Sequence, residues 1–366
     1  MEVSGGVSLP EDVIFAVLSW LPVKPLCRFR CVSKGWRTLI SSPAFITAQR
    51  SHAAPLLVGV FVAPASSDKL DLQVMDTDGN VLRVLSGVLR SYDYGRLLPT
   101  RLDVICVDNL GNGASVIDPA TRAAIAVGRQ CRRHDDVRRA RQTNVFGRAA
   151  ASGAYKVLRL YERLLGVWPE RVVLGPLCDV ATLGGDTEPA WRQRPAPPFY
   201  TCWCATCTAT VNGVIYFLPS GACCKYLARP DVASFDLERE EWKETIHGPE
   251  LRWPKPWERW SVALGELKGT VCFVQTVRSG LHGPYTDVNI WLLADPERSL
   301  WIKEYKVYST SSLFSVKPLE VLFDGRLLLL KTIDEVYGAS YSYTHILQLY
   351  DPSGTYGGFH GRKADV

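Results

Sequence analysis

The hydrophobic pattern of this chain changes its period near residue 55, and no single fold class accommodates both parts. Before that point, apolar residues recur at the three- and four-residue spacing of helices. After it they alternate or form short runs between Gly, Pro, Asn and Asp, which is typical of strands and turns. A chain of 366 residues is also too long for one ordinary core. We therefore predict a small helical module, residues 1–50, and a large all-β domain, residues 51–366.

The helical module is predicted to hold three short helices. Pro10 suits the first turn of the first helix and precedes two acidic residues, which the helix dipole favours there, and Pro22 ends that helix. The second helix begins near Pro25. Ser33 is a good N-cap for the third, which the segment 41–43 terminates.

These helices carry more apolar surface than so small a unit can bury within itself. Part of that surface should therefore meet a partner or the domain that follows. The pattern alone leaves two interpretations open: a docking module, or an N-terminal helical cap on the larger domain.

Residues 8–46 resemble an F-box, and in particular the plant type. The matching pieces are Leu9-Pro10-Glu11-Asp12, Leu18, Leu21-Pro22-Val23-Lys24, Leu26, Arg28 to Lys34, and Trp36. The resemblance implies docking onto a Skp-type adaptor and, through it, onto a cullin scaffold. It assigns eight residues to the adaptor interface or its immediate support: Leu9, Pro10, Ile14, Leu21, Pro22, Leu26, Val32 and Trp36. Two residues depart from the family pattern: Pro25 replaces the usual serine, and Cys27 stands where leucine is common.

The all-β part contains a weak repeat of about fifty residues. Its clearest unit is an apolar strand ending in Asp, followed by a turn and a second strand, as in the segments 114–119, 232–242, 290–301 and 347–352. A Gly-containing tight turn with an apolar strand precedes each of these units. The spacing favours a β-propeller of about six kelch-like blades, near residues 55–85, 101–128, 155–194, 208–246, 262–308 and 318–359. A pair of β-sandwiches is the alternative.

Several of these segments resemble the F-box-associated β domain that follows plant F-boxes. They are Asp118 to Arg122, Tyr155 to Val157, Val211 to Tyr216, and Phe235 to Leu237 with Trp242. The resemblance extends over residues 100–330 and implies a domain that recognises a protein target.

Five cysteines, at 202, 204, 207, 223 and 224, invite a zinc interpretation. Adjacent residues of a strand face opposite ways, so Cys223 and Cys224 are not expected to bind one ion together. We expect these cysteines to be buried thiols on neighbouring strands, and we predict neither a metal site nor a cofactor.

One segment, Trp253 to Trp260, is unusual because it holds three tryptophans and two prolines. So many prolines are incompatible with a central strand. Trp and Arg dominate the hot spots of protein interfaces, so we select Trp257 and Arg259 as candidate target-binding residues. Packing at the mouth of a blade is the alternative role for this loop.

The remaining features exclude several functions. No nucleophile-elbow, zinc-protease or phosphate-loop motif occurs, so we expect no catalytic residues and a non-enzymatic adaptor. A net charge of +5 makes nucleic acid an improbable partner. The start of the chain resembles no secretory signal, and no apolar run is long enough to span a bilayer, so we expect a cytoplasmic and/or nuclear protein without a membrane partner.

The function expected from the sequence is substrate recognition in a Skp–cullin–F-box ubiquitin ligase. In this interpretation the F-box binds the adaptor, and the β domain binds an unknown protein target for ubiquitination and degradation. The alternative is a propeller enzyme or a carbohydrate-binding module with an incidental helical cap.

Overall fold

The computed structural model consists of two compact units. The first comprises Met1–Leu57 and the short segment Asp76–Asn80, and the second comprises the rest of the chain. The structure describes residues 9–363 apart from 53–54, 63–68, 91–95, 99–100, 109–112, 120, 128–138, 166–171, 185–188, 224–226, 280–284, 310–312, 314, 338–339 and 353–359.

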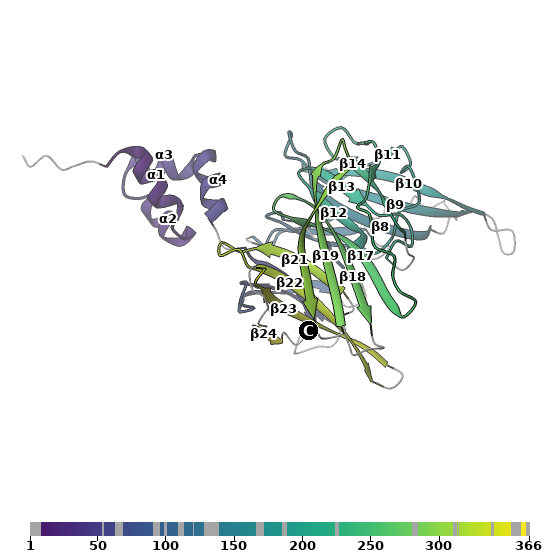
Figure 1. Ribbon diagram of the computed structural model, residues 1–366. Coiled ribbons are helices and arrows are strands. Elements are labelled where there is room, and N and C mark those ends of the chain that lie inside the picture. The colour runs from purple at the N-terminus through teal and green to yellow at the C-terminus, as the bar shows by residue number, and fades with distance from the viewer. Residues whose placement is uncertain are drawn as a thin grey trace, which may run out of the picture. The chain divides into compact units, whose positions relative to one another are not determined.

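The helical unit contains four short helices (Figure 1): α1 (Glu11–Ser19), α2 (Val23–Phe29), α3 (Lys34–Ser41) and α4 (Pro43–His52). The predicted cap of α3 is confirmed, because the backbone N–H of Trp36 donates to Ser33 Oγ at 3.1 Å. Helix α2 begins two residues earlier than expected. Helix α4 was not predicted, because Ser41-Ser42-Pro43 was interpreted only as the end of the third helix. In fact Ser42 caps a new helix by accepting from the N–H of Phe45, and Pro43 occupies its first turn.

The four helices share a small core. Leu18, Leu26, Ile40 and Phe45 are buried in it, and partly buried aromatic and aliphatic side chains surround them. Phe15 packs edge-on against Phe45, with ring centroids 5.3 Å apart. Each helix thus contributes one buried apolar side chain, and these four residues hold the unit together.

The second unit is a β-propeller of six antiparallel sheets, as the sequence predicted. The first three blades are β1 (Leu57–Val62), β2 (Lys69–Met75) and β3 (Val81–Arg90); β4 (Arg96–Leu98), β5 (Ile105–Asp108), β6 (Ala114–Ile117) and β7 (Ala124–Val127); and β8 (Arg139–Arg148), β9 (Tyr155–Leu165), β10 (Val172–Leu183) and β11 (Trp191–Arg194).

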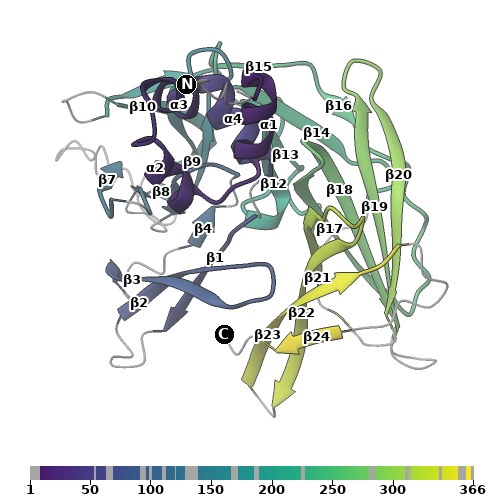
Figure 2. The same ribbon diagram turned by 90° about the vertical axis from the view of Figure 1, so that its left-hand side faces the viewer.

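The other three blades complete the ring (Figure 2). They are β12 (Thr208–Val211), β13 (Val214–Phe217), β14 (Asp231–Asp236), β15 (Glu241–Trp242) and β16 (Ile246–His247); β17 (Glu258–Leu267), β18 (Thr270–Ser279), β19 (Tyr285–Asp295) and β20 (Leu300–Ser309); and β21 (Ser315–Val321), β22 (Leu327–Tyr337), β23 (Ser340–Tyr350) and β24 (His360–Lys363).

The recurring Asp closes the turn after the third strand of a blade, as predicted. Asp236 Oδ1 accepts from the N–H groups of the second and third residues that follow it, and Asp295 does the same in the next blade. Six residues after each Asp stands a tryptophan whose indole N–H reaches the preceding blade: Trp242 donates to the carbonyl of Pro195, and Trp301 to that of His247. The Asp of the repeat therefore stabilises the turn, and the tryptophan forms a hydrogen bond between neighbouring blades.

The propeller has two faces that the strand directions define. The first strand of one blade contacts the first strand of the next, as in the pairs β8–β12, β12–β17 and β17–β21. We call the side on which the chain enters these first strands the entry face; it carries residues 200–207 and 251–257. We call the opposite side the hairpin face; it carries the tight turns Asn212-Gly213 and Lys268-Gly269, whose positive φ angles suit such hairpins. The ten residues of β17 separate the two faces by about 30 Å.

None of the described helices has both the length and the apolar character that crossing a membrane requires.

Candidate functional site

The helical unit leaves one apolar face of α1 uncovered. Ile14, Leu18 and Leu21 follow each other at helical spacing and pack toward the core of the unit. Val13, Val17 and Trp20 occupy the neighbouring positions and are exposed, with 59% of Val17 accessible to solvent. Apolar side chains in such an arrangement are typical of a surface that a partner covers.

The eight residues assigned to the adaptor interface differ in their exposure. Leu9, Pro10, Pro22 and Val32 are exposed, Ile14, Leu21 and Trp36 are half-buried, and Leu26 is buried. The exposed four offer direct contact to a partner. The half-buried three and Leu26 pack within the core of the helical unit.

Four exposed apolar residues of the same region were not among the predicted interface residues: Val13, Val17, Trp20 and Val23. Val13 and Val17 belong to an apolar stripe of the first helix that also holds Ile14, Leu18 and Leu21. The stripe is wider than three neighbouring helices can cover, and this excess width was the available signal.

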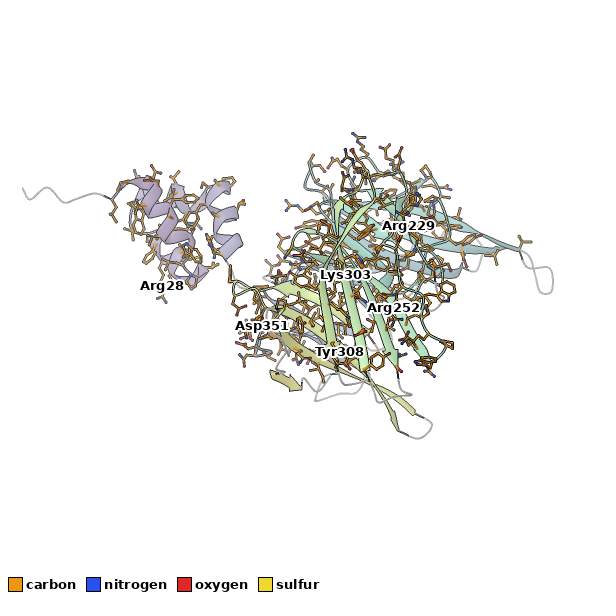
Figure 3. The ribbon with its side chains drawn as sticks, viewed as in Figure 1. Arg28, Arg229, Arg252, Lys303, Tyr308 and Asp351 are labelled. Atoms are coloured by element: carbon orange, nitrogen blue, oxygen red, sulfur yellow. The ribbon has the colours of Figure 1, made fainter. Side chains whose placement is uncertain are left out.

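The tryptophan-rich loop lies on the entry face. Hydrogen bonds to Glu258, the first residue of β17, hold it in place. The carboxylate of Glu258 is buried and accepts two hydrogen bonds from the guanidinium of Arg252, at 2.8 and 2.9 Å (Arg252 is labelled in Figure 3). It also accepts from the backbone N–H of Lys255 at 2.8 Å and from the Tyr285 hydroxyl at 2.9 Å. The hydrogen bonds from Arg252 lower the pKa of Glu258 from its ordinary value of 4.5 to about 2.

The side chains of this loop are exposed to different degrees. Trp257 is 40% exposed and has the Lys255 ammonium 5.7 Å from its ring centroid, and Arg259 on β17 is exposed. Trp260 is half-buried against the core beneath the loop. Trp253, at the start of the segment, is the most exposed tryptophan of the loop at 73%. The loop is thus ordered by Glu258 while it presents two indoles to solvent.

Four of the five clustered cysteines also meet on the entry face. Cys202, Cys204 and Cys207 lie in the connection that leads into β12, and Cys223 lies in the connection from β13 to β14. Their sulfur atoms all lie within 4.8 Å of one another. The expectation of thiols on neighbouring strands was therefore wrong: they occupy loops, where the alternation of a strand does not apply. Cys224 lies outside the described residues.

The hairpin face carries a polar cavity of about 540 Å³. The turn between β8 and β9, the turn Asn212-Gly213, and the charged side chains of Arg101, Arg148 and Glu266 line it. Arg101 forms ion pairs with Glu266 and Glu320, so the charges of Arg101 and Glu266 are compensated within the propeller. The cavity contains no aromatic anchor among its lining residues, in contrast to the loop on the entry face.

Comparison with protein families identifies both units. Residues 7–47 match the F-box domain, and residues 91–327, more than half of the chain, match the F-box associated beta propeller domain. The chain is an F-box protein. Its F-box corresponds to the helical unit, and the matched part of its propeller runs from blade two through blade five and into the sixth.

Two relatives from Arabidopsis thaliana agree with this membership. This F-box protein is 24% identical over 343 residues to F-box protein At1g30790 of Arabidopsis thaliana, an alignment that covers 87% of this chain and 79% of the relative. It is 46% identical over 56 residues to F-box only protein 12 of the same plant, which covers 14% of each chain. Among solved structures, AofleA from Arthrobotrys oligospora aligns over 86% of this chain and 87% of its own, with 12% identity and a TM-score of 0.38.

Membership of the family bears on the two candidate surfaces in different ways. An F-box in general binds a Skp-type adaptor, so the exposed face of α1 in this F-box protein belongs to a module with a known kind of partner. The match to the F-box associated beta propeller domain does not identify what the loops of the propeller bind. The target-binding residues therefore stay a prediction that rests on the geometry of the entry face.

Proposed function

We propose that this F-box protein is the substrate-recognition subunit of a Skp–cullin–F-box ubiquitin ligase. The observation that carries the proposal is the uncovered apolar face of α1, which lies within the segment that matches the F-box domain. Burial of Val13, Val17 and Leu9 against an adaptor would remove exposed apolar surface from water, which is the main driving force of association.

The proposed role of the propeller is to hold a protein target on its entry face. Trp257 and Arg259 are the proposed anchors, and the exposure of Trp253 adds a third. The mechanism is proximity, because tethering the target beside the ligase raises the effective concentration of its lysines. Catalysis then belongs to partner proteins, and the chain itself acts as a non-enzymatic adaptor in the cytosol or the nucleus.

The test is co-purification of the full-length chain with a Skp-type adaptor and a cullin. We expect both to be recovered with the wild-type chain. A Leu21→Ala, Pro22→Ala double variant should lose most of the adaptor while its propeller keeps its thermal midpoint, since the two units have separate cores. A folded wild-type chain that recovers no adaptor would remove the basis of the proposal, and recovery of the adaptor without a cullin would indicate an F-box protein that acts outside a ligase.

A further inference from the structure

The four cysteines of the entry face form a compact group of sulfur atoms. The distance between the Sγ atoms of Cys202 and Cys223 is 3.6 Å, and that between Cys204 and Cys223 is 3.5 Å. Cys202 and Cys207 are buried, Cys223 is partly buried and Cys204 is exposed. The group thus sits at the edge of the core, with one side open to the solvent from which a metal ion would arrive.

These distances match the arrangement of four thiolates around one tetrahedral metal ion. With metal–sulfur bonds of about 2.3 Å, the sulfur atoms of a zinc tetrathiolate lie about 3.8 Å apart. We propose that Cys202, Cys204, Cys207 and Cys223 bind one Zn²⁺ ion in a structural site. The donor set is closed, because four protein ligands leave no position for water or substrate, and such a site stabilises structure without catalysing a reaction.

The spacing of the ligands agrees with this proposal. Cys204 and Cys207 form a Cys-x-x-Cys pair around the 3₁₀ turn Ala205–Cys207, in which the N–H of Cys207 donates to the carbonyl of Cys204 at 3.0 Å. Cys223 lies sixteen positions after Cys207, in a separate connection. A Cys-x-x-Cys pair is a usual element of structural zinc sites, and here Cys202 and Cys223 complete the set of four ligands. Cys223 contributes without its neighbour Cys224, so the opposite orientation of adjacent strand residues does not oppose this set.

The backbone around the thiols holds them in place independently of any ion. The N–H of Cys202 donates to the carbonyl of Leu218 at 2.8 Å, and the N–H of Leu218 donates to the carbonyl of Cys207 at 3.0 Å. The guanidinium of Arg96 donates to the carbonyl of Trp203, between the first two ligands, at 3.1 Å. Because these bonds fix both connections, the ion would enter a preformed cradle and lose little energy to reorganisation.

Neither disulfide bonds nor an iron–sulfur cluster suits the group as well. A disulfide needs a sulfur–sulfur distance of about 2.05 Å and joins sulfurs in pairs, whereas Cys223 is equally close to two partners. An iron–sulfur cluster attaches its cysteines to different irons around an inorganic core, and sulfurs that all lie within 4.8 Å of one another leave no space for that core.

The site would support the target-facing loop from below. Cys202 and Cys207 belong to the same core cluster as Leu251, which precedes the tryptophan-rich loop, and Trp260 packs against that cluster from β17. An ion that crosslinks the connections into β12 and β14 would therefore fix the base on which the loop rests. This inference concerns the propeller alone and holds whether or not the chain works in a ligase.

The test is metal analysis of the purified full-length chain, prepared without added metal. We expect about one zinc per chain in the wild type. Cys204→Ser should reduce the zinc content severalfold while the fold persists, because Cys204 is exposed and serine preserves its size. Cys31→Ser is the matched control, since Cys31 is an exposed cysteine of the helical unit, and it should retain the full zinc content.

A second measurement separates loss of metal from misfolding. A strong chelator should lower the thermal midpoint of the wild type and of Cys31→Ser, but not that of Cys204→Ser, and added Zn²⁺ should restore the first two. A folded wild-type chain with four titratable thiols at these positions and no bound zinc would overturn the proposal. Intact-mass analysis that finds a disulfide among the four would overturn it as well, in favour of a redox-active group, and iron in place of zinc would correct the identity of the metal.

Discussion

The helical unit and the propeller treat their apolar side chains in opposite ways. Among its described residues, the helical unit buries four large apolar side chains and exposes eight: Leu9, Val13, Val17, Trp20, Val23, Val32, Ile46 and Leu56. The propeller buries most of its apolar side chains in clusters that connect successive blades. The exposed apolar residues of its entry face are few, and the tryptophans of one loop are prominent among them.

This difference indicates how each unit obtains its stability. A module of about fifty residues gains only a few kcal/mol from its own core, so a partner that covers its outer face also stabilises it. The propeller stacks its sheets on one another and needs no partner for its core. Binding at the helical unit should therefore involve a broad apolar surface, whereas binding at the propeller should depend on a few anchoring side chains.

The largest expected effect comes from the core of the helical unit. Phe45→Ala removes a side chain that is 1% exposed and packs against Phe15, which should cost about 3–5 kcal/mol. That exceeds what so small a core supplies, so we expect the helical unit to unfold and adaptor binding to be lost. Hydrogen exchange of residues 11–52 and a binding titration measure both effects.

The matched control is Phe323→Ala, which removes a phenylalanine that is 76% exposed in the propeller. It should change neither the thermal midpoint nor adaptor binding. If Phe45→Ala also lowered the thermal midpoint of the propeller, the two units would not be independently stable.

The next effect concerns the anchors on the entry face. A Trp257→Ala, Arg259→Ala double variant should bind the target at least thirtyfold more weakly, about 2 kcal/mol, while it keeps its thermal midpoint and its adaptor binding. The measurement is capture of targets by the propeller, read out by mass spectrometry and then by titration of the protein found. Leu300→Ala, an exposed apolar residue of β20, is the control and should capture targets normally.

An unfavourable result would be equally informative. A sharp fall in the thermal midpoint of the double variant would make the loop a structural plug, and the site assignment would lose its basis. Normal capture by the double variant together with loss in Trp253→Ala would move the anchor to the more exposed indole.

The sequence predicted most of the architecture, because its signals were local. The Asp turn and the glycine hairpins are formed by residues close together in the chain, so six blades were countable from the repeat. Helix α4 was missed because a proline can follow the end of one helix and can also occupy the first turn of the next. At Pro43 only the hydrogen bond from the N–H of Phe45 to Ser42 Oγ shows that a new helix begins. The indole contacts of Trp242 and Trp301 with the preceding blades need tertiary structure, and no local pattern contains them.

The candidate sites were less predictable, for the same reason. Which half of the stripe on α1 faces outward depends on where the other helices pack. The convergence of Cys223 with Cys202 depends on the path of two separate loops. Glu258 carried no signal in the sequence, because its role arises from the approach of Arg252 and Tyr285 in the folded state.

A smaller effect tests the outer face of α1 directly. Val17→Ala removes two methyl groups from an exposed position without touching the core, so the helical unit should stay folded. Loss of that apolar contact should weaken adaptor binding by about 1 kcal/mol, or roughly fivefold. Val172→Ala is a close control, because Val172 in β10 is 57% exposed against 59% for Val17. Equal affinities of the two variants would show that the adaptor binds elsewhere on the unit.

The smallest effect concerns the pH dependence of the loop. The pKa of Glu258 falls from 4.5 to about 2 on folding, chiefly through the hydrogen bonds from Arg252. A carboxylate with a lowered pKa stabilises the folded state fully above pH 4.5, and that contribution is lost as the pH falls toward 2. Since Arg252 remains 42% exposed, we expect the contribution to be about 1 kcal/mol or less.

Comparison of the wild type with Glu258→Gln isolates this contribution from those of other carboxylates. The wild type should have the higher thermal midpoint at pH 6, and the difference should shrink between pH 4.5 and 2, because protonation makes the two side chains alike. Glu240, whose burial is outweighed by hydrogen bonds from Arg192, Lys156 and Arg194 that lower its pKa to about 2, titrates in the same range in both proteins and so cancels. Glu241→Gln makes the same substitution at an exposed site and is the matched control, with a thermal midpoint close to that of the wild type at pH 6. If the difference in thermal midpoint between the wild type and Glu258→Gln did not change with pH, the shape of the side chain, and not its charge, would stabilise the loop.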